Sequence, residues 1–192
     1  MPKSQLGWLV LGSGGWAFAI VIWWSSVTSG VLHVPSWDVR DIFLPAGRAF
    51  LAGSNPYADG VALPDQPFFY APPWAALWGI LAPLGSLPVH ALLVVSELLA
   101  LRYIAGSWLR AGAFCWFPLV PWEISYGQIN LLVTAAIVAA VRGRPEPAAV
   151  LGLAKMAPVL AVSPRQWRPF LLTLGLFALL SLPNPAAWVW WL

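Results

Sequence analysis

Long apolar runs, separated by short polar or basic connections, dominate the pattern along this chain. A helix needs roughly 20 predominantly apolar residues to cross a bilayer, since each residue adds about 1.5 Å of length. Several of the runs are shorter than that, but their number and spacing predict an all-α, polytopic bundle of transmembrane helices. The runs cover residues 6–27, 88–109, 111–126, 128–141, 147–163 and 169–182, with a further proline-marked stretch at 68–85.

One long polar connection interrupts this pattern, between Thr28 and Pro67. Within it, apolar residues recur at helical spacing, which predicts a short amphipathic helix lying along the membrane surface. These apolar residues are Ile42, Ala46, Ala49 and Phe50. The charged residues of the connection are Asp38, Arg40, Asp41, Arg48, Asp59 and Asp65.

Composition excludes a soluble domain. Apolar residues make up 60% of the 192 and charged residues only 9%, whereas soluble domains are about a quarter charged. The 14 Trp cluster near the ends of the runs, where indole rings favour the boundary between lipid and water. The formal charge of +3 is scattered over helix ends rather than gathered in a patch, which favours membrane topology over nucleic-acid binding. Cys115 is the single cysteine, so the chain builds neither an internal disulfide nor a cysteine metal site.

Positive charge predicts the orientation in a cell membrane, because Lys and Arg near short loops stay cytoplasmic. All basic clusters share one side if the 68–85 stretch lies in the interface instead of crossing. The N-terminus is then cytoplasmic and residues 28–87 are external. The clusters are Lys3, Arg102 with Arg110, Arg142 with Arg144, and Arg165 with Arg168.

The run at 147–163 must begin and end on the cytoplasmic side in this topology. We therefore expect a bent pair of short helices, with Lys155 near the bend and Pro158 just after it, because proline ends or kinks a helix. The runs expected to cross are 6–27, 88–109, 111–126, 128–141 and 169–182.

Carboxylates in the external connection are the first candidates for catalysis, because a carboxylate at the boundary can deprotonate a hydroxyl acceptor. Asp38 and Asp41 precede the amphipathic segment, and they serve equally well as caps of a helix N-terminus. Asp59 and Asp65 fit a solvated loop.

Lys155 lies in an apolar setting, where an ammonium group requires a partner or water. It suits the phosphate of a lipid carrier, or it snorkels to the lipid headgroups. Gln128 and Asn130 place two amides at the start of a helix, where they bind a polar ligand or cap the helix. Glu97 needs a partner within its run, and Arg102 reaches it only if the helix bends or water intervenes.

No glycine-rich phosphate loop of the Walker type is present in the sequence. The small residues Gly12-Ser13-Gly14-Gly15 lie inside an apolar run, where they favour close approach of a second helix. A sugar-transferring membrane enzyme without a nucleotide site needs a lipid-linked donor.

Four segments together resemble the polyprenyl-phosphate-sugar-dependent glycosyltransferases of the C-type superfamily, in particular glycosyltransferase family 87, which contains α-mannosyltransferases. The resemblance extends over residues 30–170. Its segments are 38–57, Phe69-Tyr70-Ala71-Pro72-Pro73, Gly127-Gln128-Ile129-Asn130 and Gly152-Leu153-Ala154-Lys155.

The resemblance implies a C-type transmembrane bundle with interfacial helices in a long first external loop, 28–87. Residues 1–192 would form one transmembrane domain, the N-terminal part of a longer enzyme. Asp38, or alternatively Asp41, matches the catalytic aspartate. The donor, a polyprenyl-phosphate-linked mannose or other hexose, requires neither a metal nor a cofactor. The residues implied in binding it are Lys155, Gln128, Asn130, Arg48 and Tyr57.

Two other function classes stay open at this point. One is a non-catalytic remnant or interaction protein with the same fold. The other is a small-solute transporter, suggested by the intramembrane Glu97 and Lys155. A transporter favours inverted repeats or paired broken helices, and the sequence contains no convincing internal repeat. Membrane lipid is the expected partner in every case.

Overall fold

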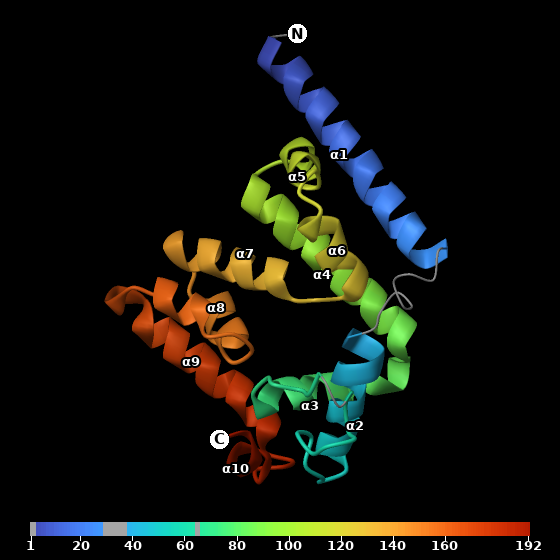
Figure 1. The fold of residues 1–192 in the computed structure, drawn as a ribbon. Helices are drawn as coiled ribbons and strands as arrows, with labels where there is room; N and C mark the ends of the chain where they lie inside the picture. The colour runs from blue at the N-terminus through green and yellow to red at the C-terminus, as the bar shows by residue number, and fades with distance from the viewer. Residues whose placement is uncertain (1–2, 29–37, 64–65) are drawn as a thin grey trace. The chain divides into compact units, whose positions relative to one another are not determined.

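The described part of the chain is all-helical. A computed structural model describes residues 3–28, 38–63 and 66–192, and these contain helices and turns but no strand (Figure 1). The all-α class predicted from the apolar pattern is confirmed. Residues 29–37 and Asp65 of the expected external loop lie outside the described residues.

Ten α-helices and five shorter helical turns follow one another in the described chain. The α-helices are α1 (Lys3–Thr28), α2 (Leu44–Leu51), α3 (Pro72–Leu81), α4 (Ser86–Ala105), α5 (Trp108–Phe114), α6 (Leu119–Tyr126), α7 (Asn130–Val141), α8 (Glu146–Gly152), α9 (Trp167–Ala178) and α10 (Ala187–Trp191). The shorter turns are the π-helical η1 (Asp38–Phe43) and the 3₁₀ turns η2 (Ala82–Leu84), η3 (Ala157–Ala161), η4 (Pro164–Gln166) and η5 (Leu179–Ser181).

Two helices of the described chain are long and apolar enough to cross a membrane, within Gln5–Ser25 of α1 and Ser86–Ala105 of α4. A third crossing results if α6 and α7, bent by 111° at a short break, act as one span. These helices indicate a membrane protein. The ten-residue α3, at about 1.5 Å per residue, is too short to cross, which agrees with the expectation that the 68–85 stretch stays in the interface.

The expectation of continuous helices over 88–109 and 111–126 is wrong. The first run ends at Ala105, because Gly106 adopts a positive φ of 79° and Ser107 then caps α5 by accepting a hydrogen bond from the Arg110 backbone N–H at 3.2 Å. The second run breaks after Phe114, and α6 starts only after Pro118. The break after Phe114 leaves only short helices in the second run, and α7 and α9 have 12 residues each. The described chain therefore contains fewer full-length spans than the apolar runs predict.

The run at 147–163 forms two short helical segments with a break between them, as expected, while their bend and their place in a membrane stay predictions. Helix α8 ends at Gly152, and the 3₁₀ turn η3 begins at Ala157. Lys155 lies between them, and its backbone N–H donates to the Leu151 carbonyl at 2.8 Å. The proline after the lysine is accommodated in η3, where it does not interrupt an α-helical hydrogen bond.

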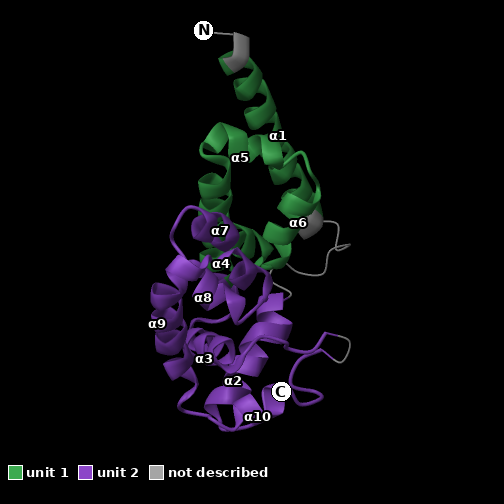
Figure 2. Ribbon diagram, turned by 90° about the vertical axis from the view of Figure 1, so that its left-hand side faces the viewer, with its two compact units in different colours: residues 1–37, 90–135 green, residues 38–89, 136–192 purple. Residues whose placement is uncertain are grey.

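The chain forms two compact units, coloured separately in Figure 2. Unit 1 comprises residues 1–37 and 90–135, and unit 2 comprises residues 38–89 and 136–192. Helices α4 and α7 each contribute residues to both.

In unit 1, glycines allow the backbones of α1 and α5 to meet. A Cβ on Gly15 would collide with the carbonyl of Gly112, and one on Gly12 would collide with the backbone of Leu109. Two indole N–H groups join the same pair of segments: Trp16 donates to the Trp108 carbonyl and Trp116 to the Leu11 carbonyl, both at 3.0 Å. The helix approach predicted from Gly12-Ser13-Gly14-Gly15 is confirmed.

We expect Gly15→Leu to destabilise this crossing, because no space exists for the added side chain. Overpacking a close contact costs about 1–3 kcal/mol and sometimes more. Gly7→Leu on the same helix is the matched control, since a Cβ there meets nothing within 4 Å. Thermal unfolding in detergent measures both variants, and equal melting temperatures would contradict the observed crossing.

Unit 2 packs α2 on α3 and α8 on α9. Glycine again sets the first contact, because a Cβ on Gly47 would collide with the backbone around Gly79. The segment that precedes α10 contacts the end of α2: the Asn184 side-chain amide donates to the carbonyls of Phe50 and Ser54, both at 3.1 Å. A small apolar core joins α8 and α9 to the end of α7; it consists of Ala140, Ala148, Ala149 and Phe170.

Candidate functional site

The amphipathic segment of the expected external loop forms η1 and α2. Ile42, Ala46 and Phe50 are buried on one side, whereas Arg40 and Arg48 are exposed. A helical segment with one buried side is therefore present, and its position along a membrane surface stays a prediction. Pro45 lies in the first turn of α2, directly after η1.

Asp38 begins this segment, and its side chain is buried, with 5% of its surface exposed. A buried carboxylate is shielded from bulk water, and its surroundings determine how readily it accepts a proton. Asp38 begins η1, which leads directly into α2, and α2 packs against α3.

Asp41 lies in a different environment, although it is only three residues away. Arg40 donates to both of its oxygens, from Nε to Oδ1 at 2.8 Å and from Nη2 to Oδ2 at 2.6 Å. Hydrogen bonding to Asp41 raises the pKa of the Arg40 guanidinium. The two N–H donors use one lone pair on each carboxylate oxygen, so Asp41 keeps further accepting capacity while it is paired with a cation. The pairing of Arg40 with Asp41 was not predicted, although the two residues are adjacent in the sequence.

An aromatic cluster packs against this segment from α3 and the residues before it. Phe43 stacks on Trp78 with ring centroids 4.7 Å apart, and it also contacts Phe68 and Tyr70. Trp74 extends the cluster by an edge contact with Tyr70. Such ring pairs add about 0.5–1.5 kcal/mol each beyond their buried area, so the cluster holds η1 firmly on α3.

Tyr57, expected to bind the donor, is committed to a structural hydrogen bond. Its hydroxyl donates to the Tyr70 carbonyl at 2.9 Å, and its own backbone N–H donates to the Asn55 side chain at 2.9 Å. Burial raises the pKa of the Tyr57 phenol, which keeps it neutral. The phenolic oxygen can still accept a hydrogen bond from a ligand. Its proton, however, is donated to the Tyr70 carbonyl, and this bond connects the turn at Asn55 to the segment before α3.

Lys155 is connected to the same structure through the turn that precedes it. The Ala71 backbone N–H donates to the Leu153 carbonyl at 2.9 Å, and the Trp74 indole donates to the Val150 carbonyl at 3.0 Å. Lys155 itself is half-buried. The start of α3 is thus hydrogen-bonded to the end of α8, two residues before the lysine.

The amides expected at the start of the 128–141 helix belong to unit 1, whereas Asp38, Arg48, Tyr57 and Lys155 belong to unit 2. Asn130 begins α7, and its amide donates to both oxygens of Glu123, at 2.7 and 2.6 Å. Gln128 is half-buried in the break between α6 and α7.

Glu97 does not pair with Arg102, and that expectation is wrong. Its side chain on α4 is fully buried, and neither of its oxygens has a hydrogen-bond partner among the described residues. The described residues also contain no group of three or more His, Cys, Asp or Glu side chains that could hold a metal ion.

Comparisons with protein-family models, with curated proteins and with solved structures find no match to this chain.

Proposed function

We propose that this chain is a membrane glycosyltransferase that moves a hexose, such as mannose, from a polyprenyl-phosphate carrier to a hydroxyl acceptor. Its fold would be a C-type glycosyltransferase bundle related to family 87. The observation that carries the proposal is that three of the four segments behind the resemblance pack in one unit. These segments are 38–57, 69–73 and 152–155.

Asp38 is the general base in this proposal. Its carboxylate takes the proton of the acceptor hydroxyl while that oxygen forms a bond to the anomeric carbon. The bond from this carbon to the carrier phosphate breaks, and its electron pair leaves with the phosphate. Attack opposite the leaving group inverts the anomeric configuration. The resemblance to family 87 favours Asp38 as the base, with Asp41, which is paired with Arg40, as the alternative.

Lys155 binds the carrier phosphate and stabilises the charge that develops on it as the bond breaks. Arg48, exposed on α2, supplies a second cation in the same unit, and Tyr57 supplies an accepting phenolic oxygen. In this proposal the N-terminus faces the cytoplasm and residues 28–87 face the outside, where the carrier-linked sugar is presented.

A binding titration tests the donor class. Polyprenyl phosphate and the matching free polyprenol are titrated into the chain reconstituted in phosphatidylcholine nanodiscs. We expect the phosphate form to bind about ten- to hundredfold more tightly, because charge-assisted contacts to phosphate are worth roughly 1.5–3 kcal/mol. Equal affinities for polyprenyl phosphate and free polyprenol would show that the chain does not recognise the phosphate. That result would favour a non-catalytic interaction protein.

A further inference from the structure

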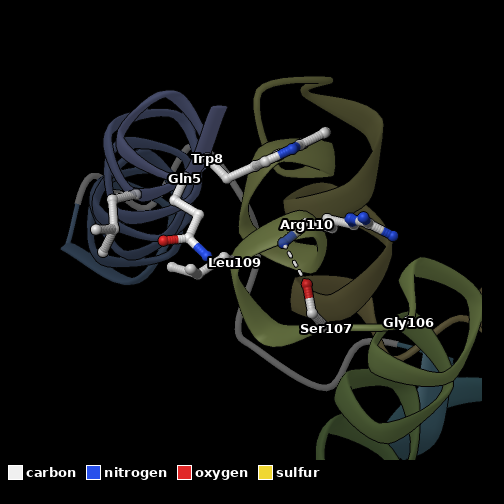
Figure 3. Close-up of a pocket in the computed structure, with 7 residues that line it drawn as sticks. Gln5, Trp8, Gly106, Ser107, Leu109 and Arg110 are labelled. Carbon is white, nitrogen blue, oxygen red and sulfur yellow. Dashed lines mark hydrogen bonds between the residues drawn. The ribbon is translucent and has the colours of Figure 1, made fainter. Parts of the chain in front are cut away.

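Unit 1 contains a pocket that the proposed transfer reaction does not use. It has a volume of about 530 Å³ and is formed by the first turns of α1 and by the segment that joins α4 to α5 (Figure 3). Its polar lining comes from Gln5, Ser107 and Arg110, and its apolar lining includes Trp8 and Leu109. None of the described residues that line it is acidic.

The pocket follows from the glycine crossing of α1 and α5. At the crossing, Gly12 lies against the backbone of Leu109. The turns of α1 that precede Gly12 and the start of α5 form the two sides of the pocket. Ser107 accepts the backbone N–H of Arg110 at 3.2 Å, which is the dashed line in Figure 3. Its hydroxyl proton therefore remains able to donate to a ligand.

Arg110 is the charged group of the pocket. The centre of its guanidinium lies 5.5 Å from the centroid of the Trp8 ring, a cation–π contact between α5 and α1. A guanidinium carries five N–H donors in a planar fork whose geometry matches a phosphate group. The guanidinium forms no ion pair with a described residue.

The surroundings of the pocket suit the chains of a lipid. Leu6 and Val10 of α1 and Leu109 of α5 expose apolar side chains close to it along the chain. Tryptophan favours the boundary where headgroups begin. The orientation predicted from the basic clusters puts Arg110 on the cytoplasmic side, where anionic lipids concentrate and where basic pockets between helices bind their headgroups.

We infer that this pocket binds the phosphate headgroup of an anionic phospholipid, with Arg110 on the phosphate, Ser107 and Gln5 as hydrogen-bond donors, and the acyl chains along α1. The site is separate from Lys155, which lies in unit 2. The shared chemistry is a phosphate ester, and we assign the lipid rather than a soluble phosphate as its source because the pocket adjoins exposed apolar side chains of a helix long enough to cross a membrane.

The test titrates short-chain phosphatidylglycerol into the delipidated chain in a non-ionic detergent. Arg110→Gln is expected to weaken binding about ten- to hundredfold, because it removes the charge-assisted contacts. Arg144→Gln, which removes an exposed arginine of unit 2, is the matched control and is expected to bind as the unchanged chain does. Arg110→Lys keeps a point charge but loses the planar fork, so a smaller loss is expected.

Two further titrations show whether the bound phosphate ester comes from a lipid or from a soluble molecule. Glycerol phosphate and phosphatidylcholine are titrated in parallel, and both are expected to bind far more weakly than phosphatidylglycerol. Glycerol phosphate binding as tightly as the lipid would overturn the lipid assignment, and equal affinity of Arg110→Gln and the unchanged chain would overturn the site. If Arg110→Gln does not elute as a folded species, Arg110→Lys and Trp8→Leu provide the same comparison. Polyprenyl phosphate binding is expected to be unchanged in all Arg110 variants.

Discussion

Asp38→Asn is expected to reduce sugar transfer by about 10²–10⁴-fold, the contribution of a positioned general base. Asparagine has nearly the same size as aspartate, but its amide does not take up the proton of an acceptor hydroxyl. Since Asp38 is buried at the start of η1, the isosteric change keeps the packing there. Initial rates of hexose transfer in nanodiscs, with thermal unfolding as a check of folding, measure the effect.

Two carboxylates of the same connection are the controls. Asp41→Asn breaks the partly exposed pair with Arg40, which contributes only about 0–1 kcal/mol, so transfer is expected to stay within severalfold of the unchanged chain. Asp59→Asn alters an exposed side chain and is expected to have no effect. Retained transfer in Asp38→Asn together with a loss in Asp41→Asn would move the base to Asp41.

Lys155→Met is expected to weaken polyprenyl-phosphate binding by about ten- to hundredfold while the protein stays folded and inserted. Methionine has a similar apolar length, so a lysine that merely snorkels to the headgroups tolerates the change at modest cost. The turn before Lys155 is held by the bond from Ala71 to Leu153, which does not involve the lysine side chain, so the bend is expected to survive.

The matched control for that variant is Arg165→Met, which removes an exposed cation of unit 2 by the same replacement. Its affinity for polyprenyl phosphate is expected to equal that of the unchanged chain. If Lys155→Met and Arg165→Met both bind normally, Lys155 has no role at the carrier phosphate. If both lose affinity equally, the effect comes from net charge and not from a site.

Local features of this fold could be read from the sequence. The helical spacing of Ile42, Ala46 and Phe50 predicted the amphipathic helix, since it depends on neighbouring residues alone. The glycines at positions 12–15 predicted the close crossing without identifying its partner, α5. Lys155 lies at the predicted break because the proline after it excludes a continuous α-helix.

Other features depend on direction and on distant contacts. Glu97 and Arg102 are five residues apart, which turns their side chains about 140° from one another on a helix of 3.6 residues per turn, so sequence proximity was a poor guide to pairing. The break between α5 and α6 falls inside an apolar run whose hydropathy does not change. The bond from the Trp74 indole to the Val150 carbonyl joins segments 76 residues apart and leaves no local signal.

The candidate site was predicted in part. The resemblance favoured Asp38, with Asp41 as the alternative, and the bidentate contact of Arg40 with Asp41 became visible only with side-chain geometry. Tyr57 was expected at the donor, but its hydroxyl proton is used within the fold. The role of each residue in transfer stays a prediction.

The most direct test of the central proposal is transfer itself. The chain in phosphatidylcholine nanodiscs is given a polyprenyl-phosphate hexose labelled in the sugar, or the corresponding nucleotide-linked hexose, with a hydroxyl acceptor. The proposal predicts that label passes to the acceptor from the lipid-linked donor only, with inversion at the anomeric carbon and with loss of the signal in Asp38→Asn. Transfer from the nucleotide donor, or no transfer from the lipid donor by a folded chain that binds polyprenyl phosphate, would contradict it.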